Sequence, residues 1–97
     1  MAYGIVLEFT GVTRDQYDAV NDKLGIDMVS GTGDYPPGLI SHGAGPTPDG
    51  WLVTEIWESK AAQETFMSSR LGAALATVGV PAPTHVGDSE LVIFQTP

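Results

Sequence analysis

The 97-residue sequence contains no cysteine, so it has no disulfide framework, no thiolate nucleophile and no cysteine metal site. It is also poor in positive charge, with four lysine and arginine residues against twelve aspartates and glutamates and a formal net charge of −8. Such a chain repels phosphate backbones and anionic lipid surfaces. We therefore expect it to bind neither nucleic acid nor membranes.

Long hydrophobic runs are missing as well. No stretch approaches the roughly 20 apolar residues of a membrane span, and no basic segment followed by an apolar run marks a secretory signal. We therefore expect a cytoplasmic protein. The length predicts one domain over residues 1–97, with a modest core and a size at which pairing with a second copy adds stability.

The most strongly patterned stretch is Gly50–Ser59, which is rich in β-branched and aromatic residues and follows a Pro/Asp/Gly turn. Residues two apart on a strand share a face, so one face carries Trp51, Val53, Glu55 and Trp57. The other face carries Leu52, Thr54, Ile56 and Glu58. Both faces are largely apolar, which indicates cover on both sides. In a chain this short, its own helices provide one cover, and we expect a second copy of the protein to provide the other.

Three further strands are predicted. Tyr3–Phe9 alternates, with Ile5, Leu7 and Phe9 on one face and Val6 and Glu8 on the other. Leu39–Ala44 is rich in small residues and should form an antiparallel hairpin with the central strand through the turn at 46–50. Val86–Phe94 supplies the last strand, apolar on both faces in its second half.

The first helix is predicted over residues 14–24. Thr13, followed three residues later by Gln16, is the capping-box pattern, and Gly25 is a natural C-terminal stop. The apolar stripe of this helix is Tyr17, Val20 and Leu24, and the residues expected outside are Asp15, Asp18, Asn21 and Asp22. The glycine- and proline-rich segment 26–38 is expected to be a loop, mobile or functional.

The second helix is predicted to start after Ser59 and to end at Gly79. Its expected apolar stripe is Ala62, Phe66, Ser69, Leu71, Ala73 and Leu75. The element order is then βαββαβ, which predicts an α+β, ferredoxin-like fold with two helices on one face of a four-stranded antiparallel sheet.

The run Glu55–Ala62, followed by Phe66 and Ser69, resembles the antibiotic-biosynthesis-monooxygenase-like proteins of the dimeric α/β-barrel superfamily. The resemblance implies a homodimer in which two sheets face each other, with a small-molecule pocket between the sheet and helices of each subunit and Trp57 in its lining. Haem-degrading relatives carry an iron-ligating histidine in the region of Phe66. This chain departs from that pattern, so haem binding, the weakest of the alternatives, is not expected.

Three residues are candidates for proton transfer. Glu8 lies mid-strand, where burial would suit it to general-base work; alternatively it lies near the strand end and faces water or bonds a turn. His42 could shuttle protons or bond a ligand carbonyl, or it is structural or exposed. Tyr17 offers a ring and a hydroxyl to steady an anion. His85 is expected at the surface, and two distant histidines without a ligand spacing predict no metal and no cofactor.

Four residues are candidates for substrate binding: Trp57, Phe66, Glu55 and Trp51. Aromatic faces stack on aromatic ligands, but the same residues also suit an ordinary core. Glu55 shares the face of Trp57 and is open to the same two interpretations as Glu8. Arg70 either pairs with a ligand anion or forms an ion pair on the helix surface.

The leading hypothesis is a homodimeric, cofactor-independent enzyme acting on a small aromatic or polyketide-like molecule. In it, Glu8 or His42 removes a proton, Trp57 and Phe66 hold the ring, and Tyr17 steadies the anion. Reaction with dioxygen would give a quinone-forming monooxygenation, and its absence an isomerisation or cyclisation. The alternative is a non-catalytic dimer that binds a ligand or another protein, because no strong catalytic motif is present.

Overall fold

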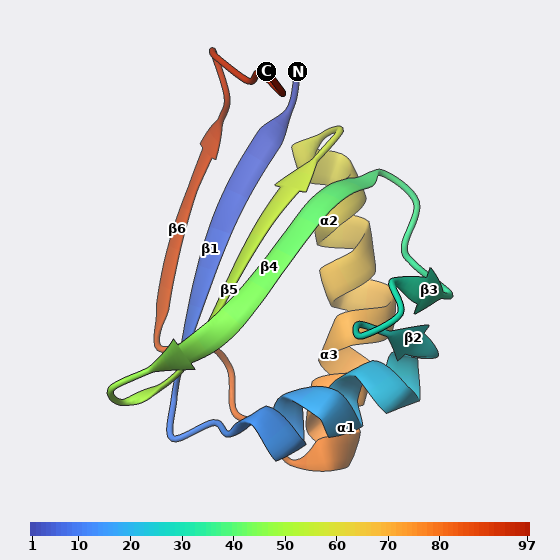
Figure 1. Cartoon of the computed structure of the whole chain (residues 1–97), viewed down its shortest axis with the longest axis vertical. Helices are drawn as coiled ribbons and strands as arrows, with labels where there is room; N and C mark the ends of the chain where they lie inside the picture. Colours follow the sequence, from blue (N-terminus) through green and yellow to red (C-terminus); the bar gives the residue numbers. More distant parts are fainter.

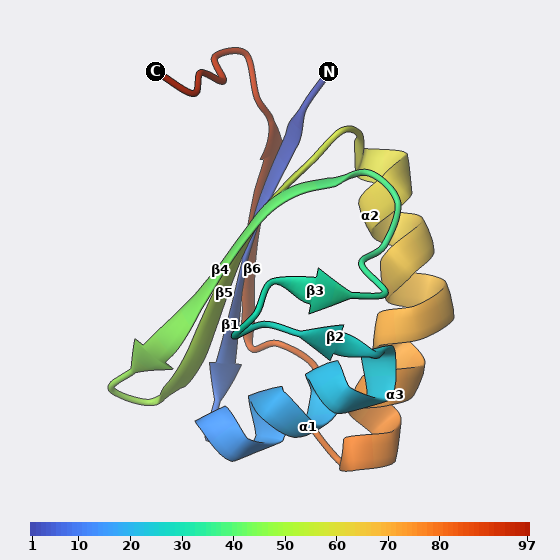
Figure 2. The ribbon, with the colours of Figure 1, turned by 45° about the vertical axis from the view of Figure 1, so that its right-hand side comes forward.

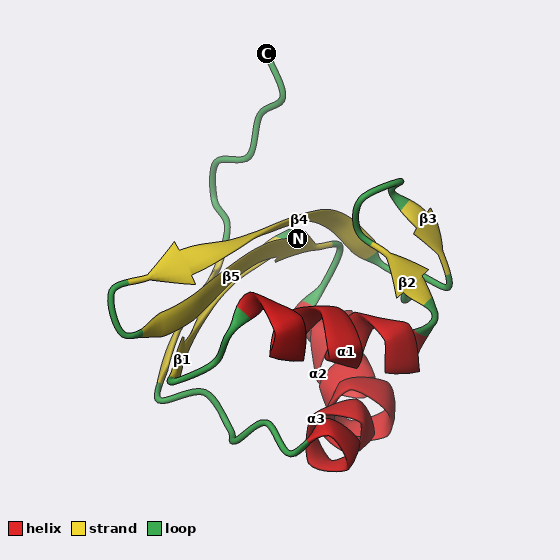
Figure 3. Cartoon of the chain, turned by 60° about the horizontal axis from the view of Figure 1, so that its bottom comes forward, coloured by secondary structure: helices red, strands yellow, loops and turns green.

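A computed structural model describes all residues of the chain, 1–97 (Figure 1). Four antiparallel strands form one sheet in the order β4-β5-β1-β6; their bounds are β1 Tyr3–Thr10, β4 Leu39–Thr47, β5 Gly50–Trp57 and β6 His85–Glu90. The helical segments are α1 Arg14–Leu24, α2 Lys60–Phe66, the π-helical turn η1 Met67–Leu71, and α3 Gly72–Val78. All of them lie on one face of the sheet (Figure 3). The predicted ferredoxin-like α+β fold is thus confirmed.

The core lies between the inner face of the sheet and these helices. β1 and β5 pair so that Tyr3 lies opposite Trp57 and Leu7 opposite Val53, which places the apolar residues of both strands on the same side. Trp57 is completely buried. The inner face of β5 is the one that carries Trp51, Val53, Glu55 and Trp57, since all four are buried.

α1 begins and ends where the sequence predicts. The Thr13 side chain accepts from the Gln16 backbone N–H, and the Gln16 side chain accepts from the Thr13 backbone N–H. Gly25 closes the helix with a φ of 76°, a conformation that favours glycine. One prediction about this helix is wrong: Asn21 does not face outward but is buried. It follows Val20 and lies one turn after Tyr17, so it belongs to the same stripe.

The second helix contains a π turn that the sequence did not reveal. The Gly72 N–H bonds to the Met67 carbonyl, an i→i+5 bond that inserts about one extra residue into the turn. The inward face shifts accordingly after Phe66. Ser69 and Ala73, predicted to be in the apolar stripe, are exposed, whereas Ala74 is buried.

The segment after α1 folds into a small hairpin of β2 Ile26–Asp27 and β3 Thr32–Gly33. The predicted loop is therefore partly ordered. The Asp27 carboxylate accepts backbone N–H bonds from Val29 and Ser30, which fixes the turn and lowers the pKa of Asp27. The hairpin stands beside α1, on the side where strand β4 forms the edge of the sheet (Figure 2).

The last strand is shorter than predicted. β6 ends at Glu90, which pairs with Tyr3, the first residue of β1. One further bond follows, from the Leu91 N–H to the Ala2 carbonyl at 2.8 Å. The apolar residues after Leu91 leave the sheet, and Val92 is 87% exposed. The chain end projects away from the sheet (Figure 3). No helix in the structure combines the length and the hydrophobicity that crossing a membrane requires.

Candidate functional site

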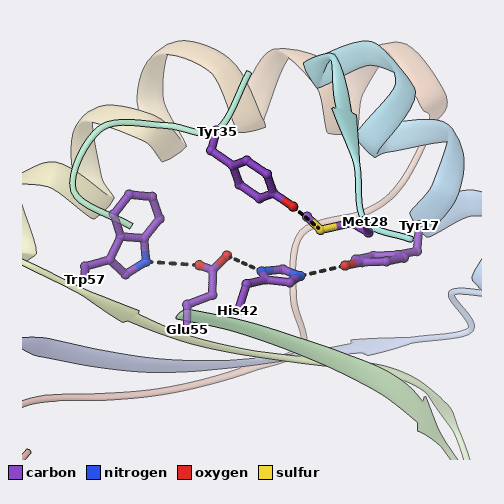
Figure 4. Close-up of polar contacts among 6 residues, drawn as sticks. All are labelled: Tyr17, Met28, Tyr35, His42, Glu55 and Trp57. Atoms are coloured by element: carbon purple, nitrogen blue, oxygen red, sulfur yellow. Dashed lines mark hydrogen bonds and ion pairs between the residues drawn. The ribbon is translucent and has the colours of Figure 1, made fainter. Parts of the chain in front are cut away.

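Four side chains joined by hydrogen bonds form a line along the inner side of the sheet (Figure 4). The Tyr17 hydroxyl lies 2.6 Å from His42 Nε2, and His42 Nδ1 lies 2.9 Å from Glu55 Oε2. Trp57 Nε1 donates to Glu55 Oε1 over 3.1 Å. Since an ionised carboxylate only accepts, His42 Nδ1 carries the proton and Nε2 accepts from Tyr17. We call these four residues the polar chain.

A β-bulge in β4 puts His42 in this line. His42 lies opposite Glu55, Ser41 opposite Ile56 and Leu39 opposite Trp57, so Ile40 is an extra residue without a partner. In a regular strand Leu39 and His42, three positions apart, would face opposite sides. Because Ile40 is bulged out, both side chains face the helices and line the same cavity.

An apolar cavity of about 60 Å³ lies between the sheet and the helices, next to the polar chain. Its walls include Leu7 and Phe9 from β1, Val20 from α1, and Leu71 and Leu75 from the second helix. The enclosed space is small for a polycyclic ligand, since ligand sites commonly measure roughly 300–1,000 Å³. A polycyclic ligand must therefore extend out of the cavity.

A wider groove of about 1020 Å³ adjoins this cavity, between α1, the β2–β3 hairpin and the edge strand β4. Seven residues line both spaces and define what we call the mouth: Tyr17, Asn21, Ile26, Met28, Leu39, His42 and Trp51. Two members of the polar chain, Tyr17 and His42, thus lie at the mouth. A ligand can reach these polar groups with one end in the cavity and its remainder in the groove.

The Tyr17 hydroxyl is held in its protonated form. Burial raises the pKa of Tyr17, and the nearby charges of Glu55 and Asp18 act in the same direction. The Asn21 amide lowers the pKa of Tyr17, although its Nδ2 has no partner in hydrogen-bond geometry. The Tyr17 ring stacks on the His42 imidazole with centroids 6.0 Å apart and contacts the Trp51 ring at 5.1 Å.

Two buried donors near the mouth have no hydrogen-bond partner, Asn21 Nδ2 and Trp51 Nε1. Asn21 is 6% exposed and Trp51 7% exposed. Sequence reasoning selected Trp51 as a ring and missed Asn21. The i, i+3, i+4, i+7 spacing of Tyr17, Val20, Asn21 and Leu24 could have revealed it.

The remaining sequence candidates fall into two groups. Phe66 packs against Trp57 with ring centroids 5.5 Å apart and also lines the cavity. Glu8 is not brought together with the others, because it lies on the opposite face of the sheet, between Leu52 and His85 of the neighbouring strands. His85 is exposed, as predicted.

Arg70 bridges three segments rather than facing the cavity. Its guanidinium donates to the Leu24 carbonyl at 2.9 Å, to the Asp34 carbonyl at 2.7 Å and to the Asp34 carboxylate at 3.2 Å. It also lies over the Phe66 ring, 5.7 Å from the centroid. Arg70 therefore ties the second helix to the end of α1 and to the segment that follows β3.

Solved structures share this fold over nearly the whole chain. A Chloroflexus aurantiacus J-10-fl protein, provisionally assigned as an antibiotic biosynthesis monooxygenase, superposes with a TM-score of 0.64 at 20% identity, covering 99% of this chain and 98% of its own. Rv0793 from Mycobacterium tuberculosis has a TM-score of 0.64 at 17% identity, covering 99% of this chain and 100% of that one. The Streptomyces coelicolor monooxygenase from the gene ActVA-Orf6, solved with Nanaomycin D, has a TM-score of 0.56 at 19% identity, covering 99% and 91%.

No protein-family model matches the sequence, and no curated protein matches it significantly. The structural similarity therefore concerns the fold. It bears out the resemblance to antibiotic-biosynthesis-monooxygenase-like proteins that the sequence suggested.

Proposed function

We propose that the protein is a homodimeric, cofactor-independent enzyme that removes a proton from a small aromatic or polyketide-like molecule, as a monooxygenase or as an isomerase or cyclase. The observation that carries this proposal is the polar chain at the wall of an apolar cavity. A half-buried tyrosine and histidine and a buried carboxylate are joined by hydrogen bonds, as in an activated nucleophile, here with the tyrosine oxygen as proton acceptor.

In the proposed reaction, the Tyr17 oxygen accepts the proton from a phenolic hydroxyl or an activated carbon of the ligand. At the same time Tyr17 gives its own proton to His42 Nε2, to which it already donates over 2.6 Å. The resulting imidazolium is stabilised by Glu55, whose carboxylate accepts from Nδ1 over 2.9 Å. The raised pKa of Tyr17 fits this concerted transfer, because it disfavours a free tyrosinate in the resting protein.

The carbanion that remains has two fates. If it reacts with dioxygen, a carbon–oxygen bond forms, and the resulting peroxide anion takes the proton back from His42 through Tyr17 and becomes a hydroperoxide. Loss of water then leaves a carbonyl, so a CH₂ group and O₂ become C=O and H₂O. If dioxygen does not react, return of the proton at another carbon completes an isomerisation, and attack on a carbonyl of the same molecule completes a cyclisation.

The test is the aerobic oxidation of 1,8-dihydroxyanthrone to the anthraquinone, followed by absorbance and by oxygen uptake. We expect Tyr17→Phe and His42→Ala each to lower kcat by roughly 100-fold or more, the usual contribution of general acid–base groups. Tyr3→Phe and His85→Ala are matched controls, because Tyr3 bonds Asp88 on β6 and His85 is exposed. Equal rates in all four variants and the original protein would contradict the proposal.

The outer face of the sheet supports the homodimer. Val6 is exposed there, beside a shallow depression of about 470 Å³ whose lining includes Thr54 and Ile56. An apolar sheet face of this kind favours cover by another protein surface. We propose that a second copy provides it, in a protein located in the cytoplasm.

A non-catalytic binding protein is the second candidate. It is favoured by the mutual satisfaction of the polar chain, in which Trp57, Glu55, His42 and Tyr17 are all paired with one another. In that case aromatic ligands raise the melting temperature, since ligand binding to the native state stabilises it, without any turnover.

A further inference from the structure

We infer that the groove outside the mouth binds a protonated amine of the ligand, so that the substrate is a polycyclic ring compound with a basic substituent on the end that leaves the cavity. This assignment rests on the proposed function, because it concerns the outer part of the same ligand. The carboxylates that carry it lie outside the polar chain.

One stripe of α1 forms a wall of the groove. Its members are spaced by three and four residues, as neighbours on a helix surface are: Arg14, Tyr17, Asp18, Asn21 and Asp22. Tyr17 and Asn21 also line the inner cavity, whereas Asp18 and Asp22 line only the groove and are exposed. The wall thus changes from a ring and an amide at the mouth to carboxylates further out.

The negative charges of the groove exceed its positive charges. Asp27 of the hairpin also lines it, and two backbone N–H bonds within its own turn lower the pKa of Asp27, which keeps the carboxylate ionised. Arg14 is the only lysine or arginine in the lining, and it pairs with Asp18 at 3.7 Å. Asp22 and Asp27 form no ion pair. Two carboxylates therefore line the groove without a cation.

Aromatic rings line the same space. Tyr17, Tyr35 and Trp51 are all members of the groove lining. The face of an aromatic ring attracts a cation, and ammonium groups are commonly bound between rings and carboxylates. The opposite wall is strand β4, whose lining residues from Gly43 to Pro46 carry no charge. A cationic substituent is therefore attracted to the side of α1 and the hairpin.

Buried polar atoms at the inner end of the groove indicate that a bound molecule completes it. Asn21 is 6% exposed and Trp51 7% exposed, and Asn21 Nδ2 and Trp51 Nε1 have no hydrogen-bond partner in the chain. Both side chains line the groove, and native proteins leave few buried polar atoms without a water, ion or ligand. The carboxylates further out then select the charge of the molecule that enters.

The test compares three fluorescent probes that share one tricyclic ring system: 9-(aminomethyl)anthracene, 9-anthracenemethanol and 9-anthracenecarboxylate. Their substituents are cationic, neutral and anionic at neutral pH. Binding to the original protein is measured by fluorescence titration. The amine should bind at least about fivefold more tightly than the alcohol, the effect of one or two exposed ion pairs and a ring contact, and the carboxylate should bind most weakly.

Asp22→Asn and Asp27→Asn each remove one charge and keep the shape of the side chain. The amide oxygen in Asp27→Asn can still accept the two N–H bonds of the turn. Each variant should lower the preference for the amine roughly twofold or more, and the double variant should bind amine and alcohol alike. Asp15→Asn is the matched control, because Asp15 lies exposed on the same helix but does not line the groove.

Three results would overturn this assignment: no preference for the amine in the original protein, a preference that survives in the double variant, or an equal loss in Asp15→Asn, which would reflect net charge alone. Failure of all three probes to bind would overturn it as well. None of the probes carries the acidic hydrogen of the proposed reaction, so their binding is independent of turnover. An amine preference that depends on Asp22 and Asp27, with anthrone turnover that does not depend on Tyr17 and His42, overturns the proposed function instead.

Discussion

The imidazole of His42 and the carboxylate of Glu55 face each other across the β4–β5 pair, with Nδ1 2.9 Å from Oε2. Glu55 is buried, and its second oxygen accepts from Trp57 Nε1. The carboxylate is thus fixed from one side by the indole and presents its other oxygen to the imidazole. This contact decides which nitrogen of His42 can accept a proton from Tyr17.

Replacing Glu55 by glutamine should therefore reverse the direction of the hydrogen bonds in the polar chain. If the amide oxygen keeps the bond from Trp57, the amide N–H faces His42 Nδ1, so the imidazole proton moves to Nε2 and that nitrogen can no longer accept from Tyr17. We expect kcat for anthrone oxidation to fall roughly 100-fold or more with little change in KM. Nitrogen NMR of His42 reports the tautomer directly. An unchanged tautomer together with full activity would contradict the assignment of the His42 proton to Nδ1.

Two tyrosines with raised pKa values predict a loss of stability at alkaline pH. The pKa of Tyr17 and that of Tyr3 are raised in the folded protein, mainly by burial. Between the unfolded value of about 10 and the folded value, the unfolded chain has lost a proton that the native state retains, so the free energy of unfolding falls as pH rises. Their stabilising contribution is complete below about pH 10.

Urea unfolding at about pH 9 and about pH 11, either side of the ordinary tyrosine pKa, measures this effect. Tyr17→Phe and Tyr3→Phe should each lose less stability over that interval than the original protein. Tyr35→Phe serves as the control, since the Tyr35 hydroxyl donates to the Met28 sulfur over 3.7 Å and contacts neither the polar chain nor Asp88. An equal loss in all four proteins would show that other groups govern alkaline unfolding.

The sequence predicts the sheet well because its signals are local. The alternation in β1 and β5 and the Thr13–Gln16 capping box each depend on neighbouring residues only. The π turn at Met67–Leu71 and the early end of β6 depend on tertiary partners, so no pattern in the sequence reveals them. The local pattern therefore wrongly predicts Ser69 and Ala73 in the apolar stripe of the second helix, and it extends the last strand beyond Glu90.

The candidate site shows the same division. Tyr17, His42, Glu55, Trp57 and Trp51 are all recognisable as polar or aromatic residues on otherwise apolar faces, and the structure brings them together. Glu8 is likewise a polar residue on a largely apolar strand, yet its side chain lies on the face of the sheet opposite the helices. What the sequence could not supply is the bulge at Ile40, which sets the face of His42 relative to Leu39, since a one-residue change of register exchanges the two faces of a strand.

Arg70 is expected to hold the segment 34–38 beside the groove. Replacing it by methionine leaves the Leu24 and Asp34 carbonyls without their charged donor, which should cost about 1–3 kcal/mol of unfolding free energy. Lysine keeps the charge but cannot form the same branched contacts. The free energy of unfolding of Arg70→Lys should therefore lie between that of the original protein and that of Arg70→Met. Hydrogen exchange of the backbone around Asp34 should rise in both variants.

Arg14 provides the matched control for this prediction. It forms an exposed i,i+4 pair with Asp18 at 3.7 Å, the kind of contact worth only about 0.3–0.5 kcal/mol. Arg14→Met should therefore change the free energy of unfolding far less than Arg70→Met. Equal costs for the two replacements would mean that Arg70 contributes no more than a surface ion pair.

The outer face of the sheet gives the last prediction. Val6 is 37% exposed on β1, and Ile56 of the neighbouring strand β5 lines the same depression on this face. If a second copy covers them, an aspartate at either position places a charge in an apolar interface, an unfavourable change of several kcal/mol. Light scattering at micromolar concentration should give a dimer mass for the original protein and a monomer mass for Val6→Asp and Ile56→Asp. Thr77→Asp, on the exposed side of α3, should remain dimeric, because the helices lie on the opposite face of the sheet. A monomer mass for the original protein would contradict the proposed dimer and leave the apolar outer face without an explanation. The cavity and the polar chain would be unaffected, because all of their residues belong to one polypeptide.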